Sequence, residues 1–298
     1  MRPSGGAEHA ISVAVTVPAE PPRSDASALR GKGAWLAFSG DAVDDDGFAK
    51  LDVEQIVATA KAAGLRYVEL RMAYGEFDEV TPAAKPTIDR LIDALDAAGI
   101  AVVGWTVPRA LAAADVARDA AVVRYRTAAG HGITGLAVDV ERGEEFLGSG
   151  ASGYAALRDY LHTLRAALGT RVLLAANVED PFLENLDERT YPYAEIAASA
   201  DVLQPMTYWR MLGAWDSAEK AGRAVSESIE RLRSLARREI PIGVGAQTAP
   251  LSARGAPPPP EIAAAVAAGR RLGALGVIFY DWGGTSPDQW AAIAASPW

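Results

Sequence analysis

The chain has 298 residues, of which 50% are hydrophobic and 22% are charged, and it carries a formal net charge of −9 with no cysteine. This composition is typical of a folded globular domain, and the acidic balance argues against binding nucleic acid through its phosphates, because that mode needs a basic face. The absence of cysteine excludes disulfides, thiolate metal sites and a cysteine nucleophile. His9, His131 and His162 are too dispersed to form an imidazole metal cluster, so we expect neither a metal nor another cofactor.

Residues 1–32 are rich in proline, serine, glycine and alanine, and they show no helical or strand period beyond the short apolar run 11–17. We predict a flexible leader over this range and a single folded domain over residues 33–298. The apolar run is too short for a bilayer span or a full signal peptide, so we expect no membrane insertion. Both a secreted protein that has lost its signal and a cytoplasmic protein fit this start.

From residue 33 onward, short apolar runs alternate with amphipathic stretches rich in alanine and leucine, which is the pattern of repeated β-α units around a parallel sheet. Glycines end several predicted helices just before a strand, where a left-handed cap is favoured. The predicted strands are 33–39, 66–72, 101–107, 135–141, 171–178, 201–208, 241–247 and 276–282. The predicted helices are 52–63, 84–98, 112–129, 151–167, 191–199, 217–237, 260–273 and a last one from Pro287.

Eight β-α units occupy about 250 residues in a barrel, so the sequence predicts a single α/β domain with the (β/α)8 TIM-barrel fold. A doubly wound sheet is the competing architecture. It usually has fewer strands, and no Gly-x-Gly-x-x-Gly follows the first predicted strand to bind a dinucleotide.

The active face of a barrel lies at the C-terminal ends of its strands and in the loops that follow them. The residues at these places are mostly carboxylates, amides and aromatics, which suit a carbohydrate site, and the tryptophans among them suit stacking against sugar faces. Besides Asp139 and Glu141 they are Trp35, Phe38, Glu69, Arg71, Trp105, Asn177, Glu179, Asp180, Gln204, Met206, Tyr208, Trp209, Gln247, Tyr280, Asp281 and Trp282.

Asp139 and Glu141 are two positions apart on a predicted strand, so their side chains leave the same face with Cα atoms about 6 to 7 Å apart. The alternate positions Leu136, Val138 and Val140 are apolar and suit the covering helices, so we expect the acids to point toward the barrel axis. Two like charges in a partly dry site raise at least one pKa. We expect this to keep Glu141 protonated near neutrality as a general acid.

The competing interpretation of the pair is structural, because an acid at a strand end often caps the next helix or pairs with an arginine such as Arg71 or Arg142. Glu69 and Arg71 repeat the alternate spacing on the second predicted strand, and we expect them to form an internal ion pair. Glu179 and Asp180 precede a proline, which predicts a solvated turn.

The segment 135–141, Gly-Leu-Ala-Val-Asp-Val-Glu, resembles the strand-four signature of glycoside hydrolase family 18, the chitinase-like barrels, in which alternate aspartates lead to a catalytic glutamate. Segment 205–208, Pro-Met-Thr-Tyr, resembles the family's strand-six Met-x-Tyr, and segment 276–282 resembles its strand-eight run ending in tryptophan. Thr134 and Ala137 stand where the family has its earlier aspartates, and Trp209 replaces the aspartate that commonly follows the strand-six tyrosine.

This resemblance implies hydrolysis of a polysaccharide with N-acetylated sugars, in which the substrate's own acetamido oxygen is the nucleophile. It implies that Glu141 protonates the leaving oxygen, Asp139 orients the acetamido N–H, Tyr208 holds its carbonyl and Trp282 forms the floor beneath the sugar. The residues themselves fit this substrate-assisted scheme. Two acids on one strand do not lie on opposite sides of a glycosidic bond, and the seventh predicted strand has Gln247 instead of an acid.

Three alternatives stand beside this prediction. The Asp-Val-Glu triplet is also similar to glycoside hydrolase family 25, the lysozyme-like barrels, which carry an aspartate on strand one, whereas the chain has Trp35 and Phe38 there. The loss of the two earlier aspartates fits a non-catalytic carbohydrate-binding barrel. Segment 64–70 suggests a metal-dependent sugar isomerase barrel, but no histidine stands at a strand end to bind the metal.

Overall fold

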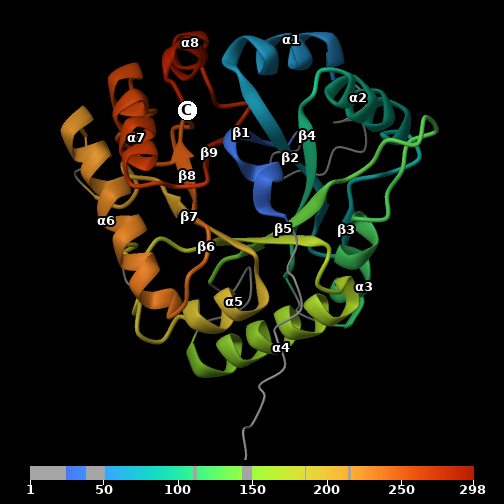
Figure 1. Cartoon of the computed structure of the whole chain (residues 1–298), viewed down its shortest axis with the longest axis horizontal. Helices are drawn as coiled ribbons and strands as arrows, with labels where there is room; N and C mark the ends of the chain where they lie inside the picture. Colours follow the sequence, from blue (N-terminus) through green and yellow to red (C-terminus); the bar gives the residue numbers. More distant parts are fainter. Residues whose placement is uncertain (1–24, 38–50, 110–112, 143–149, 185, 214–215) are drawn as a thin grey trace, which may run out of the picture.

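The computed structural model describes residues 25–37, 51–109, 113–142, 150–184, 186–213 and 216–298. These residues form a closed barrel of parallel strands with helices around its outside (Figure 1). The strands follow the order β1-β9-β8-β7-β6-β5-β4-β2 around the barrel, and a parallel β1–β2 pair closes the ring. The predicted (β/α)8 TIM barrel is therefore confirmed, and the doubly wound alternative is wrong.

All of the predicted strands and helices are present. The barrel strands are β1 Gly31–Leu36, β2 Leu65–Tyr74, β4 Ala101–Val107, β5 Gly135–Val140, β6 Leu173–Val178, β7 Val202–Thr207, β8 Gly243–Gln247 and β9 Gly276–Tyr280. A short strand, β3 Phe77–Asp78, pairs antiparallel with the end of β2. The helices are the 3-10 turn η1 Ala26–Leu29 and α1 Val53–Ala63, α2 Lys85–Ala97, α3 Ala113–Val122, α4 Gly150–Leu168, α5 Tyr193–Ser199, α6 Ala218–Ala236, α7 Pro259–Arg271 and α8 Pro287–Ala295. No helix in the described ranges is long and apolar enough to cross a membrane.

The largest difference from the predicted boundaries lies after α3, which ends at Val122, whereas the alanine-rich pattern predicts a helix to residue 129. The chain instead makes a tight turn, in which the backbone N–H of Thr127 donates to the carbonyl of His131 (2.9 Å). Asp93 on α2 holds this turn, because its Oδ1 accepts from the Thr127 hydroxyl (2.6 Å) and contacts Nδ1 of His131 (2.8 Å). The contacts with Asp93 on α2 thus outweigh the helix propensity of the alanine-rich segment after Val122.

The domain also begins earlier than the predicted residue 33. Leu29 is 1% exposed and belongs to the apolar cluster inside the barrel. The Lys32 ammonium donates to the carbonyls of Ile293 (2.7 Å) and Ser296 (3.1 Å), which ties β1 to the end of α8. The predicted leader is therefore too long at its C-terminal end, and its residues 1–24 lie outside the described part of the chain.

Side chains from the strands form two separate apolar clusters, one between the strands and the helices and one inside the barrel. Leu136, Val138 and Val140 of β5 belong to the outer cluster, whereas Ala137 belongs to the inner one. Alternate residues of one strand therefore point in opposite directions, as the pleat requires.

Large aromatic rings fill the barrel interior, and glycines on nearby strands leave room for them. A Cβ atom on Gly33 would lie 2.3 Å from the Tyr67 ring, and one on Gly245 would lie 2.9 Å from the Trp35 ring. Any larger residue at these two positions would clash, because real Cβ atoms do not approach so closely. The glycines of β1 and β8 therefore leave the space that the Tyr67 and Trp35 rings occupy inside the barrel.

Candidate active site

The acids Asp139 and Glu141 stand at the C-terminal end of β5. Asp139 points into the barrel and is 5% exposed, while Val138 and Val140 face the outer cluster, so the predicted orientation of this strand is confirmed. Glu141 directly follows the last residue of β5 and is half-buried. Both acids therefore lie where a barrel builds its active face.

Asp139 is a buried carboxyl group with a hydrogen bond at one of its two oxygens. The indole N–H of Trp105 donates to its Oδ2 (3.2 Å), and its Oδ1 has no hydrogen-bond partner among the described residues. Burial raises the pKa of Asp139 well above its usual range, and the charge of Glu141 raises it further. The raised pKa of Asp139 agrees with the sequence expectation that two like charges in a partly dry site raise at least one pKa.

Aromatic rings line the barrel beside this pair. The ring centroids of Tyr208 and Tyr280 lie 5.3 Å apart, and Tyr280 lies 5.8 Å from Trp35 and 6.5 Å from Trp105. Burial raises the pKa of the Tyr208 hydroxyl, and the charges of Tyr280 and of both acids of the pair raise it further. Tyr208 therefore keeps its proton as a neutral hydroxyl close to the carboxyl groups.

Trp209 lies away from this site, contrary to its predicted role in binding substrate. It is fully buried in the outer cluster, and its indole N–H donates to Oε2 of Glu261 on α7 (2.9 Å). The physical reason is the alternation along β7, because Met206 and Tyr208 belong to the inner cluster and the next side chain points outward.

Trp282 also lies outside the barrel, so its predicted place beneath the sugar is wrong. Its ring packs 4.8 Å from that of Trp290, in a groove of about 670 Å³ lined by α1 and α8, which neighbour each other in Figure 1. The strand ends at Tyr280, and Asp281 turns the chain by accepting from the backbone N–H of Gly284 (2.8 Å). Tyr280 takes the interior position that the sequence assigns to Trp282.

The predicted ion pair between Glu69 and Arg71 does not form. Arg71 pairs instead with Glu79 just after β3 (2.5 Å), and its guanidinium lies over the rings of Tyr74 (5.2 Å) and Trp105 (5.7 Å). Two residues of equal parity on a strand project side by side, and Arg71 lies nearer the open end, where Glu79 reaches it. Arg71 therefore lies at the edge of the site beside Trp105.

Three further residues that the sequence assigns to substrate binding are enclosed inside the barrel. Glu69, Asn177 and Gln204 are each 0% exposed, so none of them has a surface that a substrate can touch in this conformation. The Glu69 carboxylate accepts from Nε2 of Gln204 (2.8 Å) and Nδ2 of Asn177 (3.4 Å). Met206, which is 8% exposed, belongs to the inner cluster.

Glu179 and Asp180 are buried, at 6% and 1% exposure, so the predicted solvated turn is wrong. Glu179 accepts from the backbone N–H of Arg142 (3.0 Å). Asp180 accepts from the hydroxyls of Thr207 (2.8 Å) and Ser228 (2.6 Å) and so joins β6, β7 and α6. Burial raises the pKa of both carboxyl groups.

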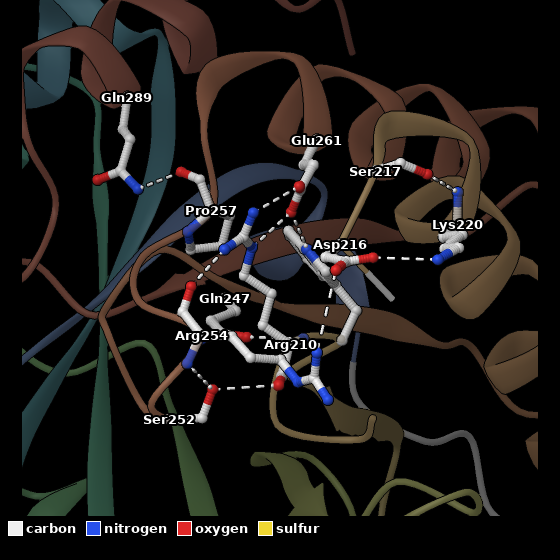
Figure 2. A network of polar contacts seen from close by, with 11 residues as sticks. Arg210, Asp216, Ser217, Lys220, Gln247, Ser252, Arg254, Pro257, Glu261 and Gln289 are labelled. Carbon is white, nitrogen blue, oxygen red and sulfur yellow. Dashed lines mark hydrogen bonds and ion pairs between the residues drawn. The ribbon is translucent and has the colours of Figure 1, made fainter. Parts of the chain in front are cut away.

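A polar network joins the loops after β7 and β8 to α7 (Figure 2). Arg210 donates to both oxygens of Glu261, from Nε (2.8 Å) and from Nη2 (2.7 Å), and to the carbonyl of Arg254 (2.5 Å). Gln247 accepts from the backbone N–H of Arg210 (3.2 Å) and donates to the carbonyl of Ala249 (2.9 Å), so it holds loops and does not face a substrate. No sequence motif marks this network, because its members are far apart in the chain.

Phe38 lies outside the described residues. Within the described ranges, no group of three or more histidine, cysteine or acidic residues has an arrangement that could hold a metal ion. The site therefore consists, in the described part of the chain, of the β5 acids with Tyr208, Tyr280, Trp105 and Trp35 around them.

Solved structures share this architecture. The family 18 N-acetylglucosaminidase from Paenibacillus barengoltzii superimposes with a TM-score of 0.59 at 13% identity, over 90% of this chain and 100% of that one. The fold is that of the chitinase-like barrels. The spore cortex-lytic enzyme SleL from Bacillus cereus gives a TM-score of 0.60 at 12% identity, over 94% of this chain and 76% of that one.

The endo-β-1,4-mannanase from Thermotoga petrophila also shares the fold, with a TM-score of 0.57 at 11% identity, over 89% of this chain and 75% of that one. No protein-family model and no curated protein matches the sequence. The likeness to these enzymes therefore shows the fold, and function has to be argued from the site.

Proposed function

We propose that the protein is a glycoside hydrolase that cleaves a polysaccharide or glycan containing N-acetylated sugars. The observation that carries the proposal is the acid pair at the end of β5, with a buried Asp139 whose pKa is raised by burial and by the charge of Glu141. Such coupling of two carboxyl groups at a barrel's active face is the arrangement that acid catalysis uses.

In this mechanism Glu141, the more exposed of the two acids, protonates the leaving oxygen. Asp139 receives the acetamido N–H of the substrate, and the Tyr208 hydroxyl donates to the acetamido carbonyl, whose oxygen attacks the anomeric carbon. Tyr280, rather than Trp282, supplies the aromatic surface next to Tyr208, because their rings lie 5.3 Å apart inside the barrel. Trp105 orients Asp139 through its indole N–H.

The strands across the barrel from β5 favour this substrate-assisted scheme. In the barrel order, β9, β1 and β8 are far from β5, and they present Tyr280, Trp35 and Gln247. None of these is an acid, and Asp281 after β9 is engaged by the Gly284 backbone N–H. A glycosidase that uses a protein nucleophile needs a second carboxylate on the opposite side of the scissile bond. The inward Trp35 of β1 likewise disfavours the lysozyme-like scheme, which needs an aspartate on the first strand.

The comparisons support the N-acetylated substrate in part. One similar structure is that of an N-acetylglucosaminidase and another is that of a spore cortex-lytic enzyme, whereas the third is that of a mannanase. The same fold occurs in both kinds of enzyme, so recognition of an acetamido group is inferred from Asp139 and Tyr208.

The test is hydrolysis of matched polymers with and without N-acetyl groups, namely chitin oligosaccharides, peptidoglycan, chitosan and mannan. Glu141→Gln removes the proton donor and keeps the shape, so we expect a loss of about 10²- to 10⁴-fold in kcat. Glu230→Gln, an exposed position on α6, is the matched control and should retain full activity. Full activity of Glu141→Gln on a glycoside that the wild type cleaves would refute the catalytic assignment.

A second candidate is a carbohydrate-binding barrel without catalysis. Its support is Ala137, which lies inside the barrel two residues before Asp139 and offers no polar atom to it, while Oδ1 of Asp139 lacks a hydrogen-bond partner among the described residues. Tight binding of an N-acetylated oligosaccharide without turnover, unchanged by Glu141→Gln, would favour this candidate.

A further inference from the structure

Three large hydrophobic side chains are exposed in the described part of the chain, and all of them lie at the C-terminal end of the barrel, the barrel mouth. They are Phe77 (47% exposed), Phe182 (41%) and Met211 (45%). Phe77 lies in the hairpin after β2, Phe182 in the loop after β6 and Met211 in the loop after β7. Single exposed apolar residues are common, but a set confined to the end that carries the acid pair indicates a binding surface.

Phe77 faces the barrel mouth because of its place in the β2–β3 hairpin. It is the register partner of Tyr74, and directly opposed residues of an antiparallel pair project from the same face. Tyr74 packs against the apolar cluster inside the barrel, so Phe77 lies on the inner side of the hairpin. The backbone N–H of Gly75 donates to the carbonyl of Val107 (2.8 Å), which fixes the hairpin on β4.

A continuous run of side chains joins this hairpin to the acid pair. The Arg71 guanidinium lies over the rings of Tyr74 (5.2 Å) and of Trp105 (5.7 Å). The Trp105 indole in turn donates to Oδ2 of Asp139 (3.2 Å). Aromatic surfaces with a few polar groups between them are typical of sites for small molecules and their polymers. The surface from Phe77 to Asp139 therefore suits a chain of sugar rings.

Met211 and Phe182 lie on neighbouring loops that are fixed to the opposite part of the site. The backbone N–H of Met211 donates to the carbonyl of the active-site residue Tyr208 (2.7 Å). The backbone N–H of Phe182 donates to Oδ1 of Asp180 (2.9 Å). Asp180 in turn accepts from the hydroxyl of Thr207, next to Tyr208 (2.8 Å). These hydrogen bonds hold the backbone beneath both exposed side chains in place, which lowers the entropy cost of binding a ligand there.

Phe77 and Met211 stand on opposite sides of the barrel mouth. Around the ring of strands, β4, β5 and β6 separate β2 from β7 in one direction, and β1, β9 and β8 separate them in the other. The acid pair belongs to β5, the middle strand of the first group. A path across the mouth therefore has exposed apolar side chains at both ends and the acid pair beside its middle.

We propose that a glycan chain lies across the barrel mouth from Phe77 to Met211 and Phe182, so that the enzyme cleaves internal bonds and is endo-acting. The inference rests on the proposed function and adds to it the length of the substrate and the position of the cleaved bond. An enzyme that trims sugars from a chain end needs extended contacts on one side of the bond. Apolar contacts at both ends of the path require a chain that extends in both directions.

The first test is the product pattern of the whole protein on soluble glycol chitin. Endo action should lower the viscosity of the polymer before a measurable fraction of the sugar appears as mono- or disaccharide. Release of mono- or disaccharide from the start of the reaction, at unchanged viscosity, would overturn the proposal.

Variants at the two ends of the path test the contacts themselves. Phe77→Ala and Met211→Ala should each raise KM for chitin hexasaccharide about five- to tenfold and leave kcat within about twofold, because the lost contacts bind substrate and transition state alike. Both variants should leave kcat/KM for 4-nitrophenyl chitobioside within about twofold, since this short glycoside does not reach either end. A KM for the hexasaccharide equal to that of the wild type in both variants, or an equal loss on the short glycoside, overturns the proposal.

The matched controls keep the apolar surface. Phe77→Tyr and Met211→Leu retain a side chain of similar size at each end and should keep the KM of the wild type. Glu76→Ala changes an exposed residue of the same hairpin without removing an apolar contact, and it should also match the wild type. A rise in KM for Glu76→Ala equal to that for Phe77→Ala would show a disturbed hairpin and would overturn the role of the Phe77 ring.

A binding measurement separates this inference from the proposed function. If no chitin oligosaccharide is cleaved, the proposed function fails, and calorimetry with chitin hexasaccharide and chitin disaccharide still tests the path. The wild type should bind the hexasaccharide at least about tenfold more tightly than the disaccharide, and Phe77→Ala and Met211→Ala should each remove most of this difference. Equal or undetectable binding of the two lengths by the wild type overturns the proposal.

Discussion

Glu261 on α7 accepts three hydrogen bonds at a place where its side chain is nearly enclosed. The donors are the Trp209 indole (2.9 Å) and two nitrogens of Arg210 (2.8 and 2.7 Å), and Glu261 is 2% exposed. Glu261→Ala leaves these donors without an acceptor, and loss of one partner of a buried ion pair costs about 3–5 kcal/mol. Because the Arg210 side chain keeps 13% exposure, we expect the lower end of this range.

A loss of about 3 kcal/mol corresponds to a fall in Tm of roughly 6 °C, since 1 kcal/mol shifts Tm by about 2 °C in a chain of this size. The assay is thermal unfolding followed by circular dichroism. Trp209→Phe removes one neutral donor and should cost about 1 kcal/mol, while Glu230→Ala on exposed α6 should change little. A Tm of Glu261→Ala within about 2 °C of the wild type would refute the reasoning.

Two further predictions follow from the site and from the buried acids. Trp282→Phe should change kcat/KM on an N-acetylated oligosaccharide by less than about twofold, whereas Tyr280→Ala should lower it about tenfold or more. The opposite order of effects would show that Trp282, and not Tyr280, contacts the substrate. Burial raises the pKa of Asp119 from 3.8 to about 6. The protonated carboxyl group therefore makes its full contribution to stability below about pH 4, and this contribution is lost as the pH rises through 6. In urea unfolding, the wild type should therefore lose up to about 3 kcal/mol relative to Asp119→Asn between about pH 4 and pH 7, and parallel profiles would contradict this.

The barrel itself is predictable from the sequence because its signals are local. Each β-α unit repeats a short apolar run and an amphipathic helix, and Gly64 ends α1 in the left-handed conformation that a glycine cap favours (φ 68°). The alternation on β5 likewise predicts which side chains face inward, so Asp139 is found in the barrel where the pattern places it.

The same alternation misplaces residues once a strand ends. Trp282 has the parity of Tyr280, but the chain turns at Asp281 and carries the indole to Trp290 on α8. Arg71 has the parity of Glu69, but its partner is Glu79, which the β2–β3 hairpin brings back to it. Side-chain partners that are set by loops and hairpins have no signature in strand periodicity.

The sequence by itself determined the eight-unit barrel, the inward face of β5 and the acid pair as the candidate centre, because strand and helix periods depend on neighbours only a few residues apart. Only the tertiary structure decided that Glu69 is enclosed with Asn177 and Gln204, partners more than a hundred residues away along the chain. Burial and charge are properties of such distant neighbours, and they set the pKa of Glu69 and Asp139. The different roles of Asp139 and Glu141 therefore depend on contacts that form only when the barrel closes.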